Sequence, residues 1–388
     1  MDNHDCILFA TADWDAPYWT NKQHTACHLA NLGLRVLYVE SMGLRPPSIN
    51  RKDIHRIWQR LKKGFKSPHA AQHNIWVFSP LIIPFKHHSP WIRKINQGLL
   101  SWQLKCFCKK NHFKHLLIWT YHPFILQTIQ KIPYDKLIYH CVDDLTAVPG
   151  VDASAFLREE RQLLTRAHAV FTTSEHLQKH CVSVNPRTYY FSNVADIQHF
   201  QKALQKNELP EELAVIPKPR IGYIGALSDF KIDFALILAI AKDFPMWHWV
   251  LIGDEHPGQK NEVVAELRTL CNVHFLGHRP YLLLPDYLGG MDVATLPSLI
   301  NSYTDAMFPM KYFEYLAAGL PIVSTPLQFT NYAKAGLEIG ERAEEFALAI
   351  KKQLARGRLT EKEINEFVAD NTWDARLKKM LEKAEIVI

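Results

Sequence analysis

Residues 301–326 read NSYTDAMFPMKYFEYLAAGLPIVSTP, and this stretch decides the fold of the chain around it. Lys311 and Glu314 are three residues apart, so they share one face of a helix. The helix is expected to end at Gly319, and Pro321 introduces the apolar run IVST, which is typical of a short buried strand. The pattern predicts a helix that leads into a strand of an α/β sheet.

The position of Lys311 in this helix has an electrostatic consequence. A cation in the first turn adds to the partial positive charge of the helix N-terminus, which is unfavourable unless an anion binds there. A phosphate group would remove the conflict. The alternative is that Lys311 and Glu314 form an exposed ion pair worth only about 0 to 1 kcal/mol.

The pattern P-x-K-x-x-E-Y-L-A-A-G-x-P-I-V at 309–323 resembles the nucleotide-sugar site of GT-B glycosyltransferases of family 4, including teichuronic-acid-type surface polysaccharide transferases. SYTDAMFPMK followed by GLPIV is also similar to the xanthan glucuronosyltransferase. The resemblance implies that Lys311 binds the donor diphosphate and that Glu314 binds the nucleotide ribose. Retaining members carry a second glutamate eight residues earlier, where this chain has Ala306 beside Asp305, so the stereochemistry stays open.

The length of 388 residues exceeds the size at which one core usually stays single, so two domains are expected. Apolar strands alternate with helices from CILFA at 6–10 onward, which predicts largely parallel sheets. The resemblance implies an α/β fold of the GT-B class, with two Rossmann-like doubly wound domains facing a central cleft. We expect an acceptor-binding domain at 1–202, a charged, proline-containing linker at 203–219, a nucleotide-sugar-binding domain at 220–371, and a helix at 372–388 that crosses back to the first domain.

Two candidate donor contacts follow strands of the second half. Gly225 ends the strand of RIGYIGAL, where the absent side chain would let backbone N–H groups approach a diphosphate. The loop GHRP at 277–280 is similar to the family's base-binding loop, which implies that Arg279 contacts the base. A plain glycine turn and a solvated loop charge are the alternatives.

Three candidate residues follow strands of the first half, where open α/β sheets carry their sites. Asp143 comes after KLIYHCV, and its match in the xanthan enzyme implies a catalytic base; the alternatives are a helix cap or an internal ion pair. His122 matches a histidine near the transferred sugar in family 4, although lone histidines are more often structural. Asp13 lies in the first loop, which the resemblance implies faces the acceptor.

The DWD run that contains Asp13 also fits a D-x-D metal motif, but that motif belongs to a different, metal-dependent fold. We therefore expect no metal and no cofactor, with the nucleotide-sugar as a substrate. Cys106 and Cys108 are too close for the usual zinc spacing, and the seven cysteines favour reduced thiols.

Residues 51–66, RKDIHRIWQRLKKGFK, carry seven Lys or Arg and one Asp, with apolar residues at helical spacing around Trp58. This composition is typical of a helix on an anionic membrane surface, and also of a surface helix packed on its own domain. No RNP or zinc-finger pattern indicates nucleic acid. With no targeting peptide or spanning run in the sequence, we expect a cytoplasmic protein, peripheral on the inner face of the cell membrane.

The function implied by the resemblance is transfer of a sugar from a nucleotide donor, for which we expect a UDP-sugar, to a hydroxyl of a lipid-linked or polysaccharide acceptor. The alternatives are a GT-B epimerase or phosphorylase, and a catalytically silent GT-B scaffold that binds a partner transferase. A silent scaffold would release no nucleotide from a nucleotide-sugar.

Overall fold

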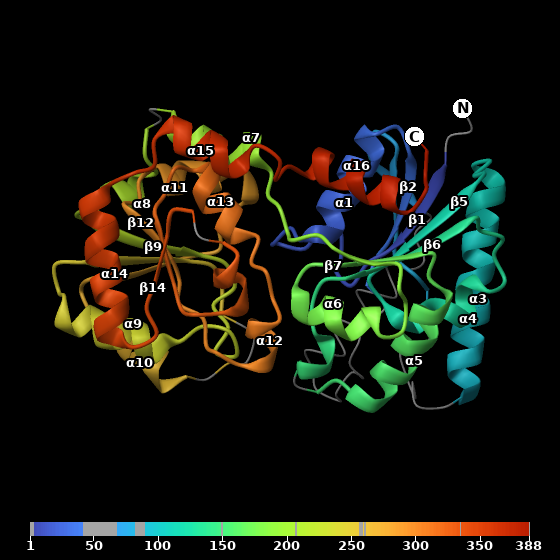
Figure 1. Ribbon diagram of the computed structural model, residues 1–388, viewed down its shortest axis with the longest axis horizontal. Coiled ribbons are helices and arrows are strands. Elements are labelled where there is room, and N and C mark those ends of the chain that lie inside the picture. Colours follow the sequence, from blue (N-terminus) through green and yellow to red (C-terminus); the bar gives the residue numbers. More distant parts are fainter. Residues whose placement is uncertain are drawn as a thin grey trace. The chain divides into compact units, whose positions relative to one another are not determined.

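The computed structural model describes residues 4–41, 68–81, 90–148, 150–205, 208–255, 259, 261–333 and 335–387. The chain forms two compact units (Figure 1). The first comprises Met1–Ser192 together with Leu377–Ile388, and the second comprises Asn193–Arg376. The basic segment at 51–66 lies outside the described residues.

The first unit is built on an eight-stranded sheet in which β3 is antiparallel to β4 and all other pairs are parallel. Along the sheet the strands are β3 (His69–Gln72), β4 (Ile75–Phe78), β2 (Arg35–Val39), β1 (Asp5–Phe9), β5 (Leu116–Thr120), β6 (Lys136–Cys141), β7 (Ala169–Thr172) and β8 (Thr188–Tyr190). Since β1 lies between β2 and β5, the winding reverses there, and ligands of such sheets bind beyond the carboxyl ends of these strands.

Both faces of the first sheet are covered by helices (Figure 1). One face packs against α3 (Pro90–Lys110), α4 (Leu126–Ile129), α5 (Ala153–Arg166) and α6 (Glu175–Val182). The other face packs against α1 (Asn21–Asn31) and α16 (Trp373–Lys383). Successive strand residues point to opposite faces, so Ile118 joins the first core and Trp119 the second.

The second unit has a six-stranded, wholly parallel sheet. Its order is β11 (Val273–Gly277), β10 (His248–Ile252), β9 (Arg220–Ile224), β12 (Val293–Leu296), β13 (Ile322–Ser324) and β14 (Leu337–Ile339). Numbered along the chain, this is the 3-2-1-4-5-6 order of the Rossmann fold, so the reversal lies between β9 and β12.

Helices cover both faces of the second sheet as well (Figure 1). One core includes α7 (Ile197–Phe200), α11 (Leu284–Gly289), α13 (Lys311–Ala317) and α15 (Glu361–Val368). The other includes α9 (Phe234–Asp243), α10 (Glu262–Leu267) and α14 (Ala343–Arg356). Two short helices, α8 (Glu211–Ala214) and α12 (Ser302–Asp305), lie in connecting segments.

The expected helix and strand around Lys311 are confirmed. The helix α13 begins at Lys311, and Gly319 takes the left-handed φ of +72° that follows a helix end. The N–H of Leu320 then donates to the carbonyl of Tyr315 at 2.9 Å, and β13 begins at Ile322.

The boundary between the units differs from the linker expected at 203–219. The division falls at Ser192 and Asn193, and the 203–219 segment belongs to the second unit. Leu213 and Ile216 are buried in the core of that unit, because the apolar residues among the charges and prolines face inward. Residues from Leu377 onward belong to the first unit, where Leu377, Met380 and Leu381 of α16 are buried.

No helix among the described residues has the length and apolarity that a bilayer span requires.

The contribution of α16 to the first unit can be measured by truncating Leu381, which is 1% exposed. Leu381→Ala should lower the free energy of unfolding by about 2 to 5 kcal/mol, because it removes buried methyl groups and leaves a cavity. Chemical denaturation followed by tryptophan fluorescence measures the change. Val387→Ala is the control, since Val387 is 75% exposed and should change stability by less than about 0.5 kcal/mol. Equal effects of the two changes would contradict the packing of α16.

Candidate functional site

In the second unit, Gly225 and Lys311 meet beyond the carboxyl end of β9. Gly225 has a φ of +146°, and a Cβ there would lie 2.4 Å from Cε and 2.9 Å from Nζ of Lys311. A side chain at this position would therefore displace the lysine. The N–H of Gly225 donates to the carbonyl of Ile252 at 2.8 Å, so what the glycine provides is space for Lys311 and not its own N–H group.

The charge of Lys311 is not neutralised by its helix partner. Its Nζ lies 5.9 Å from the ring centroid of Tyr223, and the described residues contain no carboxylate within ion-pair distance of it. Burial raises the pKa of Glu314, and the nearby Lys311 opposes that shift. The exposed ion pair considered for these two residues is therefore absent, and a cation and a carboxyl group stand beside the end of β9.

Lys231 is a second cation at this edge, and the sequence did not single it out. It follows β9 in the chain, and its Nζ lies 3.3 Å from the hydroxyl of Tyr303 and 4.7 Å from that ring's centroid. Tyr303 belongs to α12, which follows β12, so the contact joins the two loops at the reversal of the sheet. The sequence signal that could have indicated Lys231 is its place in the loop shortly after the strand-end Gly225.

The structure places Arg279 in a local cluster. Its guanidinium donates to the carboxylate of Glu212, with Nη2 at 2.8 Å, and its Nε donates to the hydroxyl of Tyr287 at 2.8 Å. The Tyr287 hydroxyl donates to Glu212 at 2.6 Å, and both contacts lower the pKa of Glu212. Arg279 therefore ties its loop to α8. To contact the base of a nucleotide, Arg279 would have to give up one of these hydrogen bonds.

The segment before Lys311 has no free carboxylate at the position of the second glutamate. Ala306 occupies that position and is 1% exposed. The neighbouring Asp305 accepts the backbone N–H of Gln328 at 2.9 Å, which holds the loop after β13. A carboxylate that fixes a loop in this way is not displayed as a sugar ligand.

In the first unit, the two aspartates after β6 have different partners. Asp144 caps a short 3-10 turn (Leu145–Ala147) by accepting the N–H of Thr146 at 3.0 Å. Asp143 instead forms an ion pair with Lys22, with Oδ2 and Nζ 3.6 Å apart. The cap that was an alternative for Asp143 thus belongs to Asp144, whereas the internal ion pair belongs to Asp143.

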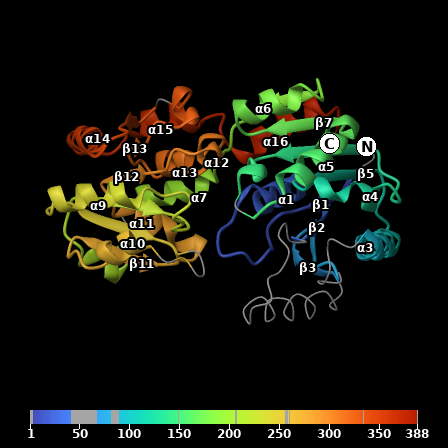
Figure 2. The same ribbon diagram turned by 90° about the horizontal axis from the view of Figure 1, so that it is seen from below.

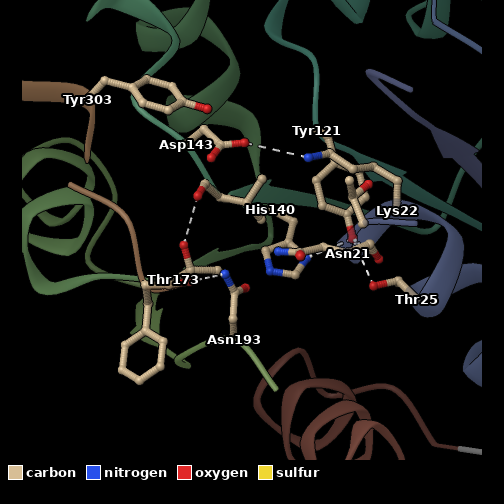
Figure 3. Close-up of polar contacts among 12 residues, drawn as sticks. Asn21, Lys22, Thr25, Tyr121, His140, Asp143, Thr173, Asn193 and Tyr303 are labelled. Carbon is tan, nitrogen blue, oxygen red and sulfur yellow. Dashed lines mark hydrogen bonds and ion pairs between the residues drawn. The ribbon is translucent and has the colours of Figure 1, made fainter. Parts of the chain in front are cut away.

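Lys22 had no role in the sequence-based prediction, yet it is central to this edge of the first sheet (Figure 3). Its side chain is 8% exposed, and its Nζ lies 5.3 Å from the ring centroid of Tyr121. The Tyr121 hydroxyl donates to Thr25 of the same helix at 2.8 Å and lies 3.1 Å from Nδ1 of His140. Burial and the nearby Lys22 lower the pKa of His140 to about 3, so this imidazole is neutral at pH 7.

A small cavity of about 80 Å³ lies beside Asp143, lined by α5 and α6. Glu160 is 3% exposed in its wall and accepts hydrogen bonds from Tyr139 at 2.6 Å and from Nε2 of His180 at 2.9 Å. The bond to Glu160 raises the pKa of His180. The space suffices for a few water molecules or a small polar group. The sequence did not indicate it, because its residues come from separate elements.

His122 begins the 3-10 turn Pro123–Ile125 after β5. Its Nδ1 accepts the N–H of Phe124 at 3.2 Å, which leaves the proton of the neutral ring on Nε2. This Nε2 is buried and has no hydrogen-bond partner among the described residues. Burial lowers the pKa of His122 to about 4, so the ring does not act as a proton donor of the imidazolium type at neutral pH.

Asp13 lies in the loop between β1 and α1, where its backbone carbonyl accepts the side-chain amide of Gln23 at 3.0 Å. The following Trp14 donates its N–H to buried Glu40 at 2.8 Å. In the first unit, the candidate residues Asp143, His122 and Asp13 all follow strands at the carboxyl edge of the sheet. In the second unit, Gly225, Lys311 and Glu314 lie together. Arg279 instead bonds to its own partners, Glu212 and Tyr287.

Comparison with known proteins shows which family and which folds the chain is similar to. Residues 218–356 match the family model described as Glycosyl transferases group 1. The chain is 27% identical, over 97% of its length and 96% of the relative's, to a protein of Bacillus subtilis (strain 168) named "Putative teichuronic acid biosynthesis glycosyltransferase TuaH".

Solved structures share the fold. Sucrose-phosphate synthase from Thermosynechococcus elongatus aligns with a TM-score of 0.70 at 16% identity, over 98% of both chains. Anabaena Alr3699/HepE in complex with UDP and glucose aligns with a TM-score of 0.61 at 17% identity, over 98% of this chain and 100% of that one. The expected GT-B fold class is confirmed.

The buried state of His122 predicts a pH-dependent stability. The folded-state pKa of about 4 lies below the unfolded value near 6.5, so the unfolded chain binds the proton first as the pH falls. The neutral, buried His122 therefore contributes to the free energy of unfolding in full above about pH 6.5. As the pH falls towards 4, this contribution is lost, and the free energy of unfolding drops by about 2 to 3 kcal/mol. His122→Asn keeps a side-chain acceptor for the cap but cannot titrate. Denaturation at pH 7, 5.5 and 4 should show a smaller loss for the variant, whereas parallel losses would contradict the prediction.

Proposed function

We propose that this chain, a glycosyltransferase of the group 1 type with the GT-B fold, moves a sugar from a UDP-sugar to a hydroxyl of a lipid-linked or polysaccharide acceptor in the synthesis of cell-surface polysaccharide. The observation that carries the proposal is the uncompensated Lys311 ammonium lying against Gly225 at the end of β9. The name of the Bacillus relative supports the polysaccharide context, and the UDP and glucose bound to HepE support the donor class.

On the donor side, Lys311 would pair with the diphosphate and stabilise the charge that develops on it as the bond to the sugar breaks. Lys231 would add a second cation from the loop after β9. Glu314 would accept hydrogen bonds from the ribose hydroxyls, since its carboxyl group is half-buried beside Lys311 without forming an ion pair with it. Two lysines at this strand edge would supply the charge neutralisation that a divalent cation supplies elsewhere.

On the acceptor side, Asp143 would take the proton from the attacking hydroxyl as its oxygen bonds to the anomeric carbon and the nucleoside diphosphate departs. Lys22 holds the carboxylate in place, and burial of this lysine fixes its own position. The cavity lined by Glu160 and His180 would receive a polar group of the acceptor next to Asp143. His122 would offer its Nε2 hydrogen to the transferred sugar.

We also propose that the enzyme acts from the cytoplasmic side as a peripheral protein, because a lipid-linked acceptor is presented at a membrane surface. The basic segment at 51–66 remains a candidate for that contact on its composition.

Lys311→Ala should weaken UDP-sugar binding by roughly 10- to 150-fold, because it removes one charge-assisted hydrogen bond to the diphosphate. Isothermal titration with UDP and UDP-glucose measures it. Gly225→Ala should have a similar effect, because the added methyl group would displace Lys311.

Two matched controls separate this effect from general damage. Lys351 also lies against an aromatic ring of the second unit, 4.7 Å from the centroid of Phe244, and Lys351→Ala should leave binding unchanged. Gly357 also has a positive φ, of +78°, but a methyl group added there would meet no atom within 4 Å, so Gly357→Ala tests backbone strain alone. An unchanged donor affinity in Lys311→Ala would end the donor assignment.

Asp143→Asn should lower turnover by roughly 10²- to 10⁴-fold while donor binding persists, because the amide has the same shape but cannot accept the proton. Release of UDP from a UDP-sugar in the presence of acceptor measures turnover. Asp144→Asn is the matched control, since asparagine caps as well as aspartate does. Equal turnover in the two variants would show that Asp143 is structural, and no nucleotide release by the wild type with any donor would favour a silent scaffold.

A further inference from the structure

The outer face of α3 carries three large apolar side chains in water. Trp91 is 76% exposed, Ile95 52% and Trp102 63%. Their spacing of four and seven residues places them on one face of the helix, which we call the α3 face. The opposite side of the same helix is buried: Leu100 and Leu104 are 2% and 0% exposed in the core of the first unit.

The α3 face lies outside the packed core of the first unit. Figures 1 and 2 both place α3 at the margin of the first unit, and Figure 2 shows the helix end-on. Isolated apolar residues are normal on a protein surface, but aligned tryptophans are not, and such patches mark a surface that binds something. The buried side already anchors the helix, so the exposed side is available for another purpose.

The charges of α3 indicate what it binds. The helix contains five Lys or Arg and no Asp or Glu. Lys94 and Lys105 each follow a tryptophan of the α3 face by three residues, so they lie along one side of the apolar stripe. Lys109 follows Trp102 by seven residues, so it continues the line of the stripe. All three are exposed. An apolar stripe with tryptophans and a rim of lysines complements the anionic headgroups and the acyl boundary of a membrane.

The size of the α3 face favours a lipid surface over a protein partner. Large aromatic side chains bury roughly 150 to 250 Å² each, so three apolar side chains fall short of the about 800 Å² per partner of a standard protein interface. A membrane does not require matching shape, since headgroups adapt to the helix and long lysine side chains reach outward from its flanks.

We propose that the α3 face lies in the interface of an anionic phospholipid membrane, with Trp91, Ile95 and Trp102 inserted at the headgroup level and Lys94, Lys105 and Lys109 against the lipid phosphates. The surface is formed by described residues alone and is distinct from the basic segment at 51–66. The proposal rests on the peripheral membrane location proposed above, for which it names a surface. It depends on no donor or acceptor chemistry, so its failure would leave the proposed sugar transfer untouched.

A dye on Cys106 tests the proposal directly. Cys106 is exposed one turn after Trp102, and Cys271, the other fully exposed cysteine among the described residues, lies in the second unit. The full chain is labelled with an environment-sensitive dye at Cys106 in a Cys27→Ser/Cys271→Ser background, or at Cys271 in a Cys27→Ser/Cys106→Ser background. With vesicles of phosphatidylglycerol and phosphatidylcholine, the emission of the Cys106 label should shift to the blue and that of the Cys271 label should not.

Binding itself is measured by vesicle flotation of unlabelled protein. Trp91→Ala/Trp102→Ala should reduce binding at least tenfold, and Lys94→Gln/Lys105→Gln/Lys109→Gln by about 100-fold, since each cation contributes roughly fivefold near an anionic surface. Pure phosphatidylcholine or high salt should weaken the wild type. Leu282→Ala/Leu348→Ala is the matched control, because these leucines are 75% and 55% exposed in the second unit. Unchanged melting temperatures would confirm that the variants fold.

Three results would overturn the proposal. The first is vesicle-bound protein whose Cys106 label shows no shift, which would place the membrane contact elsewhere. The second is a wild type that does not float with anionic vesicles. The third is a Cys106 shift that appears without vesicles as protein concentration rises and the sedimentation coefficient increases, which would assign the α3 face to contact between copies of the chain.

Discussion

Burial of both faces of each parallel sheet is the constraint on which the rest of the structure depends. Helices pack on either side of both sheets, so most strand residues are apolar and the backbone groups pair within the sheet. Polar side chains can then gather only where strands end. Asp143 and His122 follow strands of the first unit, and Gly225 follows a strand of the second. The candidate site residues therefore lie beyond the packed faces of the sheets, at their carboxyl edges.

The carboxyl edge of the first unit holds charge at low exposure, which is costly unless the charge is paired. The buried charge of Lys22 is paired in this way: it forms an ion pair with the Asp143 carboxylate and lies against the ring of Tyr121. Burial, together with the nearby Lys22, lowers the pKa of His140 to about 3, so this imidazole stays neutral beside the Lys22–Asp143 ion pair at pH 7. A carboxylate fixed in this way has a definite direction, which is what proton abstraction from a positioned hydroxyl needs.

In the second unit, by contrast, the cation Lys311 forms no ion pair among the described residues. Gly225 creates the room in which Lys311 extends, while Asp305 and Glu212 are each occupied by other partners. A lysine that forms no ion pair within the described residues gains most from binding an anion. At the surface, the α3 face combines exposed tryptophans with lysines on a helix that contains no acidic residue, which favours an anionic partner. Both features consist of groups that the fold leaves unsatisfied.

The sequence alone determined the alternation of strands and helices, the helix and strand around Lys311, and the strand-end positions of the candidate residues, because apolar periodicity and helix-stop signals are local. The GT-B class came from the motif resemblance. It misplaced the boundary between the units, since charge and proline in 203–219 do not reveal that Leu213 and Ile216 are buried. Only the tertiary structure decided that Asp144 caps a turn while Asp143 pairs with Lys22, that Arg279 is held by Glu212, and that Trp91 and Trp102 are exposed. Apart from the cap of Asp144, which is local, the contacts join residues far apart in the chain. The exposures depend on how the helices pack, which no local pattern records.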